Sequence, residues 1–169
     1  MKTSALPKNP SDGPAKTLRV KIIDLARSGA GVARENTGRT LFVPYSMPGD
    51  ELEVSVIHEE KRYAECQIES IISPSVLRVK PKCDVFGRCG GCTWQHVPYE
   101  MQWTAKHRGA QHSLEKRGVK TTSVPCDLFP ASEPFHYRNR IQLRVMNSQL
   151  GYTARKSHDF VPIHRCPIA

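Results

Sequence analysis

Three cysteines stand close together in the middle of the chain. Cys83, Cys89 and Cys92 have the spacing Cys-x5-Cys-x2-Cys. In a protein whose thiols are kept reduced, clustered cysteines indicate a metal site far more than disulfides. Gly90 and Gly91 give the backbone the freedom to bring neighbouring thiolates to one centre. The spacing therefore predicts that these thiolates bind a metal ion or a metal cluster.

A zinc ion or a cubane iron-sulfur cluster takes four ligands, so one more is needed. The candidates are Cys66, Cys126, Cys166 and a histidine such as His96. Cys166 is favoured because it precedes a proline in a loop-like segment, and Cys126 is a weaker rival. Cys66 falls on the apolar face of an expected strand and is expected in the core. Spacing alone leaves structural zinc and an iron-sulfur cluster about equally expected.

Basic side chains recur at even spacing late in the chain. Arg138, Arg140 and Arg144 would share one face of a strand, with Arg155 and Lys156 nearby across a hairpin. Guanidinium groups suit phosphate oxygens, so this face is the expected phosphate-binding surface. The alternative is a solvated sheet face paired with acidic side chains.

Other candidates for RNA contact are less strongly indicated. Lys21, Arg34 and Arg39 lie earlier in the chain, where acidic neighbours weaken the positive field. Aromatic side chains could stack an unpaired base. The candidates for stacking are Tyr137, Tyr152 and Phe160.

Positive charge is concentrated in the second half of the chain. The net charge is +9, and residues 81–169 carry 13 basic and 6 acidic side chains, against 12 and 10 in residues 1–80. Such an imbalance suits a polyanionic partner, although a basic solvated surface would also account for it. The chain has no apolar run long enough to cross a membrane, so a soluble, cytoplasmic protein is expected.

The elements that must position these residues follow from periodicity. Alternation of apolar and polar residues, short apolar runs and turn signals predict five strands in about 65 residues. Five short strands without a helical period predict a small OB-like barrel, a fold class that often binds oligonucleotides. The expected strands cover residues 17–22, 40–43, 51–57, 63–71 and 76–79.

The second half changes character. Apolar residues at helical spacing, Pro98 near the start and Gly118 past the end predict one helix over residues 98–117. Strict alternation from Tyr137 to Val145, a turn at Asn147-Ser148 and a return over residues 150–153 predict a β-hairpin. We therefore expect a disordered tail over residues 1–15, a barrel over residues 16–80 and a small α+β domain over residues 81–169.

Two groups of motifs resemble one known family. Gly29-Ala-Gly-Val-Ala-Arg34, with Leu41-Phe-Val-Pro44 and Pro48-Gly-Asp50, is similar to a TRAM domain, a small RNA-binding barrel. The segment Cys83 to His96, which ends in Cys-Gly-Gly-Cys-Thr-Trp-Gln-His, resembles the cluster motif of TRAM-containing RNA uracil-5-methyltransferases. The likeness continues through Tyr137-Arg-Asn-Arg140, Leu150-Gly-Tyr152 and Cys166-Pro-Ile, so it covers nearly the whole chain after the tail.

The resemblance implies a 4Fe-4S cluster held by Cys83, Cys89, Cys92 and Cys166, with a role in holding the RNA-binding elements in place. It implies an RNA partner, ribosomal or transfer RNA, and gives no reason to expect DNA or a membrane; a monomer is expected. Family members continue into a domain that binds S-adenosylmethionine and supplies a cysteine nucleophile and a carboxylate base. No catalytic residue can be assigned in this sequence.

Three interpretations remain. The first and favoured one is the RNA-recognition and cluster-binding part of a methyltransferase, without the catalytic domain and expected to be inactive alone. The second is a stand-alone RNA-binding module that modifies nothing. The third is a zinc-stabilised interaction domain.

Overall fold

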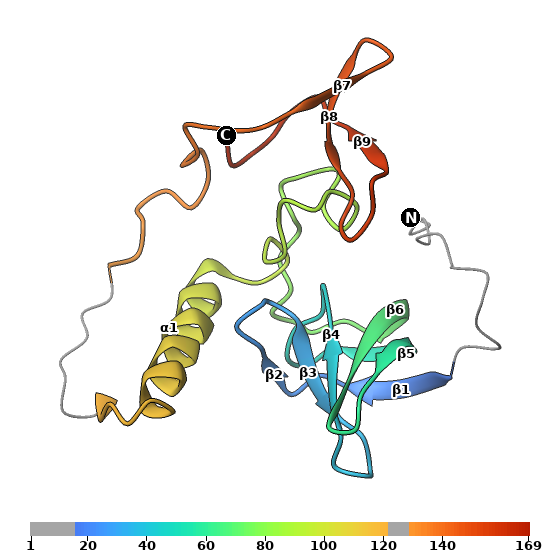
Figure 1. The fold of residues 1–169 in the computed structure, drawn as a ribbon, viewed down its shortest axis with the longest axis vertical. Helices are drawn as coiled ribbons and strands as arrows, with labels where there is room; N and C mark the ends of the chain where they lie inside the picture. The colour runs from blue at the N-terminus through green and yellow to red at the C-terminus, as the bar shows by residue number, and fades with distance from the viewer. Residues whose placement is uncertain (1–15, 122–128) are drawn as a thin grey trace. The chain divides into compact units, whose positions relative to one another are not determined.

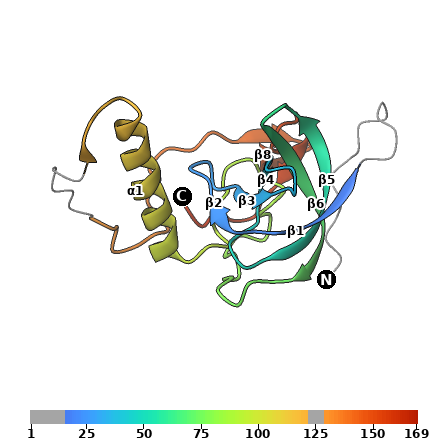
Figure 2. The same ribbon diagram turned by 90° about the horizontal axis from the view of Figure 1, so that it is seen from below.

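The computed structural model describes residues 16–121 and 129–169, which fall into two compact units (Figures 1 and 2). The first unit ends at Arg78 and the second begins at Val79. The tail expected over residues 1–15 and the weaker candidate Cys126 lie outside the described residues. No helix of the described part is long and apolar enough to span a membrane.

The first unit is a curled six-stranded sheet. Its strand order is β1-β5-β6-β4-β3-β2, and all neighbours are antiparallel except β4 and β6, which run parallel. Three register shifts in the β5–β6 pair bend these long strands, which increases the coiling of the sheet. The strands are β1 (Thr17–Lys21), β2 (Asp24–Leu25), β3 (Gly31–Arg34), β4 (Thr40–Val43), β5 (Glu51–Glu59) and β6 (Tyr63–Ser73).

Period-two alternation places one apolar face of each strand inside the curl. In β4, Leu41 and Val43 are fully buried while Thr40 and Phe42 face outward and are partly exposed. Cys66 is completely buried in this core, as expected from its place on the apolar face of β6. Burial raises the pKa of the Cys66 thiol to about 11. Cys66 is therefore a core residue.

The expectation of five strands is wrong in two places. The run Val76–Val79 is not a strand: it forms a turn, closed by the Arg78 N–H donating to the Ser75 carbonyl at 3.1 Å, and Val76 is 99% exposed. Conversely, β2 and β3 were not expected. They pair over only two residues, Asp24 with Val32 and Leu25 with Gly31, which is too short for a visible alternation.

A buried ion pair closes this unit. Asp50 is completely buried and accepts hydrogen bonds from the backbone N–H groups of Met47 (2.8 Å) and Ser75 (2.9 Å). Arg78 donates to both Asp50 carboxylate oxygens, at 2.9 and 2.8 Å, and to the Tyr45 carbonyl at 2.8 Å. The pair therefore ties the turn before β5 to the segment after β6.

The second unit contains one helix and a small sheet within its described residues. The helix α1 (Tyr99–Glu115) begins after Pro98 and ends before Gly118, which has a φ of 83°, so the predicted helix is confirmed. The sheet has the order β7-β8-β9, antiparallel throughout. Its strands are β7 (Arg144–Met146), β8 (Gln149–Thr153) and β9 (Phe160–Pro162).

The predicted hairpin is confirmed only at its tip. Asn147 and Ser148 both have positive φ, 49° and 60°, as a two-residue hairpin turn requires. The expected strand from Tyr137 to Val145 is wrong over most of its length, because β7 begins only at Arg144. Residues 137–143 have no partner strand in the described part of the chain, so their alternation forms no sheet face.

Candidate functional site

The loop from Cys83 to Cys92 is a series of tight turns. The N–H groups of Arg88 and Cys89 both donate to the Val85 carbonyl, at 3.1 and 2.9 Å. Cys89 also forms an isolated antiparallel bridge with Ala154, just after β8. These bonds fix the loop against the small sheet.

Gly90 has a different role from the one expected. Neither Gly90 nor Gly91 adopts a positive φ, so unusual backbone angles are not what these two positions need; within the loop it is Gly87, with a φ of 88°, that has them. The Gly90 N–H donates to the Thr153 carbonyl at 3.0 Å, and a Cβ at this position would lie only 3.2 Å from that oxygen. The missing side chain lets the loop approach the end of β8 closely.

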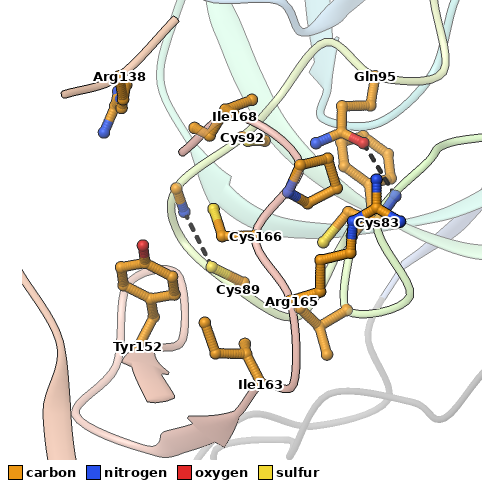
Figure 3. Close-up of a pocket in the computed structure, with 14 residues that line it drawn as sticks. Cys83, Cys89, Cys92, Gln95, Arg138, Tyr152, Ile163, Arg165, Cys166 and Ile168 are labelled. Atoms are coloured by element: carbon orange, nitrogen blue, oxygen red, sulfur yellow. Dashed lines mark hydrogen bonds between the residues drawn. The ribbon is translucent and has the colours of Figure 1, made fainter. Parts of the chain in front are cut away.

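All four predicted cysteines line one pocket (Figure 3). Cys83, Cys89 and Cys92 come from the loop, and Cys166 comes from the segment after β9, where the Ala169 N–H closes a turn onto the Cys166 carbonyl at 3.2 Å. The remaining lining is mostly apolar and contains no histidine, aspartate or glutamate among the described residues. It comprises Val85, Phe86, Gly91, Gln95, Arg138, Tyr152, Ile163, Arg165, Pro167 and Ile168.

The other candidates for the fourth ligand lie elsewhere. Cys66 belongs to the core of the first unit. His96 is fully buried, stacks at a tilt on Phe86 with ring centroids 5.6 Å apart, and does not line the pocket. Of the described candidates, Cys166 is the one that joins the three loop cysteines.

Gln95 holds the backbone at Cys83, a role that the sequence analysis did not predict. Its side-chain oxygen accepts a hydrogen bond from the Cys83 N–H at 3.1 Å, across the loop. The available signal was its position three residues after Cys92, at the end of the cysteine-rich segment.

The protein alone gives the Cys83 and Cys89 thiols little reason to ionise. Burial raises the pKa of the Cys83 and Cys89 thiols, and the neighbouring cysteines raise both further. Against this, the Gly91 N–H donates to the Cys89 Sγ at 3.4 Å and favours its thiolate. Burial, together with the nearby Cys166, also raises the pKa of Tyr152 to about 12. A bound metal cation would favour the thiolates, and its binding would release protons.

The distances between metal-binding side chains limit the kind of metal centre that they can hold. No three or more His, Cys, Asp or Glu side chains in the described ranges are arranged to hold a metal ion. Thiolates 2.3 Å from one zinc ion must lie roughly 3.8 Å from one another. A cubane cluster spreads its charge over several irons and keeps its thiolates farther apart. The four cysteines therefore line one pocket but do not have the spacing of a single-ion site in the described ranges.

The arginines expected on one strand face are separated. Arg138 lines the cysteine pocket, and its backbone N–H donates to the Ile168 carbonyl at 2.8 Å. Arg140 is exposed in the irregular segment, and the Arg144 side chain donates to the His158 carbonyl at 2.9 Å. Lys156 is exposed.

The remaining basic candidates differ in the hydrogen bonds and ion pairs that they already form. The Arg155 N–H donates to the Arg88 carbonyl at 3.4 Å, so this residue belongs to the contact between the loop and the sheet. Lys21 is exposed at the end of β1, and Arg34 donates to the Thr40 hydroxyl at 2.7 Å. Arg39 forms ion pairs with Glu35 (2.8 Å) and Glu59, so a phosphate would compete with two carboxylates there.

The aromatic candidates for base stacking also lie in different surroundings. Tyr152 turns into the cysteine pocket, and the Phe160 ring covers Gly151, where an added Cβ would lie 2.6 Å from it. Tyr137 is 59% exposed and remains accessible.

Comparison with known proteins identifies the first unit. Residues 18–77 match the family model of the TRAM domain of tRNA (uracil(54)-C(5))-methyltransferase. The curled sheet of the first unit is thus a TRAM domain of the OB-like type, the class that the strand pattern indicated.

The whole chain has relatives among RNA methyltransferases. It is 36% identical to a 23S rRNA (uracil(1939)-C(5))-methyltransferase from Halomonas elongata, over 94% of this chain and 33% of that protein. An uncharacterized RNA methyltransferase from Synechocystis is also 36% identical, over 89% of this chain and 34% of its own length.

A solved structure of an RNA methyltransferase has a similar fold over most of this chain. The Pyrococcus abyssi tRNA (uracil-54, C5)-methyltransferase, solved in complex with S-adenosyl-L-homocysteine, superposes with a TM-score of 0.60 and 28% identity, over 88% of this chain and 32% of that one. The chain is a relative of the TRAM-containing RNA uracil-C5-methyltransferases and spans about a third of their length. The family resemblance found in the sequence is confirmed.

Proposed function

We propose that the chain supplies the RNA-recognition and 4Fe-4S-binding part of an S-adenosylmethionine-dependent RNA uridine C5-methyltransferase that acts on ribosomal or transfer RNA. The observation that carries the proposal is the meeting of four cysteines at one pocket in a chain that also carries a TRAM domain. The relatives named above act on uracil C5 in both classes of RNA.

The cluster's role in this proposal is structural. The apolar cluster beside the pocket is small: in the described part it consists of the buried residues Val85, Cys89, Ala154 and Val161. A cluster bound by Cys83, Cys89, Cys92 and Cys166 would link the loop to the segment after β9 by metal-thiolate bonds. Such a link stabilises a small unit that packing alone supports weakly.

Methyl transfer itself is assigned to no residue of the described part. The chemistry needs a thiolate that adds to C6 of the base and a group that later removes the proton from C5. The four clustered cysteines are committed to the cluster in this proposal, and Cys66 is buried in the barrel core with a raised pKa. Methyl-donor binding is likewise assigned to no described residue.

The exposed arginine of the second unit provides a test of RNA binding. Replacing Arg140 with alanine is expected to weaken binding of a single-stranded RNA and to lower the slope of log affinity against log salt by about one unit, because one phosphate contact is lost. Arg138→Ala should give a similar loss if its side chain reaches RNA from the rim of the pocket. Fluorescence anisotropy at several salt concentrations measures both.

A matched control is Arg19→Ala. Arg19 is an exposed arginine of the barrel that is paired with Glu51 at 3.1 Å, so its loss should leave the slope unchanged. Iron content measured on each variant separates a lost RNA contact from a damaged cluster, which matters most for Arg138. An affinity of Arg140→Ala equal to that of the unchanged chain at moderate salt would remove this residue from the interface.

A further inference from the structure

Three aromatic rings meet on the outer surface of the first unit. Phe42 and Tyr63 pack edge to face, with ring centroids 5.9 Å apart and an interplanar angle of 64°. His58 lies tilted beside Tyr63, with centroids 6.5 Å apart. We call Phe42, His58 and Tyr63 the ring cluster. It comes from β4, β5 and β6, which are neighbours in the sheet (Figure 1).

The ring cluster is not part of the barrel core. Leu41 and Ala64, the sequence neighbours of Phe42 and Tyr63, are fully buried, so the two rings project from the opposite, outer face of the sheet. The parallel register of β4 and β6 places Thr40 opposite Tyr63. Tyr63 is 37% exposed, and an edge-to-face arrangement leaves part of a ring face open.

Basic side chains border the open side of the ring cluster. Arg34 is held beside it, because its guanidinium donates to the Thr40 hydroxyl at 2.7 Å and to the Gly38 carbonyl at 3.2 Å. Lys61 and Arg62 are exposed in the turn that joins β5 to β6, directly before Tyr63. In the part of the chain that the structure describes, no ion pair joins these two side chains to a carboxylate.

Two of the acidic side chains nearby are paired with an arginine. Glu35 and Glu59 are paired with Arg39, and Glu60 lies 3.3 Å from the His58 imidazole. Glu65 lies opposite Phe42 in the strand register and keeps that side less favourable for an anion. The favourable side for a phosphate is therefore the edge of Tyr63 that faces Arg34 and the β5–β6 turn.

We propose that the ring cluster is a stacking site for an unpaired base of single-stranded RNA, with Arg34, Lys61 and Arg62 binding the adjacent phosphates. The proposal rests on the proposed RNA-binding function and assigns a specific part of it to this surface. An aromatic ring next to exposed cations is the arrangement that binds a base by its face and a backbone by its charge. Stacking needs no particular base edge, so the site should hold any base.

The test is the affinity of the full chain for a single-stranded RNA of about ten nucleotides, by fluorescence anisotropy. Tyr63→Leu keeps apolar bulk but removes the ring, and we expect a loss of about 5- to 100-fold, from the usual strength of one base-aromatic stack. The slope against salt should not change, because no phosphate contact is lost. Tyr63→Phe retains the ring and should bind nearly as the unchanged chain does.

The matched control is Phe129→Leu, which removes an exposed ring from the second unit and should have no effect. A thermal melt of each variant excludes unfolding as the cause. Tyr63→Leu binding as well as the unchanged chain, or losing affinity only through a reduced salt slope, would overturn the stacking site while RNA binding stands. Absence of RNA binding by the unchanged chain would instead overturn the proposed function and, with it, this site.

Discussion

Replacing Cys89 with alanine is expected to remove nearly all bound iron from the protein, from about four irons per chain to less than one. Cys89 is buried, its N–H is bonded to the Val85 carbonyl, and its Sγ accepts the Gly91 N–H. No other described cysteine lies where it could replace the lost thiolate, since Cys66 is in the barrel core. Iron and sulfide analysis after anaerobic purification measures the loss.

Cys66→Ala is the matched control. It removes another buried thiol, but from the first unit, so iron content should stay at the level of the unchanged chain. Its cost should appear in the stability of the barrel, where a smaller side chain leaves a cavity. If Cys89→Ala retained full iron, or Cys66→Ala lost it, the assignment of the four ligands would be wrong.

Loss of the Asp50 carboxylate is expected to destabilise the first unit by about 3 kcal/mol. Breaking a buried ion pair leaves its partner uncompensated, and the usual cost is about 3–5 kcal/mol. The low end applies here because the Arg78 side chain is 20% exposed and water can reach it. The change is Asp50→Asn, and urea unfolding followed by circular dichroism measures it.

Glu51→Gln is the control, because it breaks the exposed pair with Arg19 and should cost less than about 1 kcal/mol. Equal effects of the two substitutions would contradict the account of Asp50 as the residue that closes the sheet.

The same carboxylate should make stability depend on acid. Burial alone would raise the pKa of Asp50, but the hydrogen bonds from Arg78, Ser75 and Met47 outweigh it and hold the pKa below its ordinary value of 3.8. Its contribution is therefore fully present above pH 3.8 and is lost as the pH falls through the lower pKa of the folded state. Asp50→Asn should flatten this acid limb of the stability curve.

The parts of the fold that the sequence predicted are those with long local patterns. The alternation in β5 and β6 and the helical spacing in α1 run for nine or more residues, long enough to identify each element. The two-residue β2 and four-residue β3 carry no such pattern. Residues 137–143 carry the pattern but have no partner strand in the described part, so alternation alone misled there.

The cysteines of the candidate site could be predicted because residue type and spacing identify them in the sequence. Cysteine spacing and the context of Cys166 were enough to name four residues that the fold brings to one pocket. The place of Arg138 was not predictable, because it depends on the backbone bond to Ile168, thirty residues away. The ring cluster was missed for a similar reason: Phe42 and Tyr63 meet only through the parallel pairing of β4 with β6.

The central claim is that the four-cysteine pocket holds an iron-sulfur cluster in a chain built to recognise RNA. The most direct test is the iron, zinc and sulfide content of the unchanged chain, purified without oxygen, together with its visible spectrum. We expect about four irons, matching sulfide and a broad absorbance at about 400 nm. One zinc per chain with no sulfide would contradict it and would make the second unit a zinc-stabilised domain.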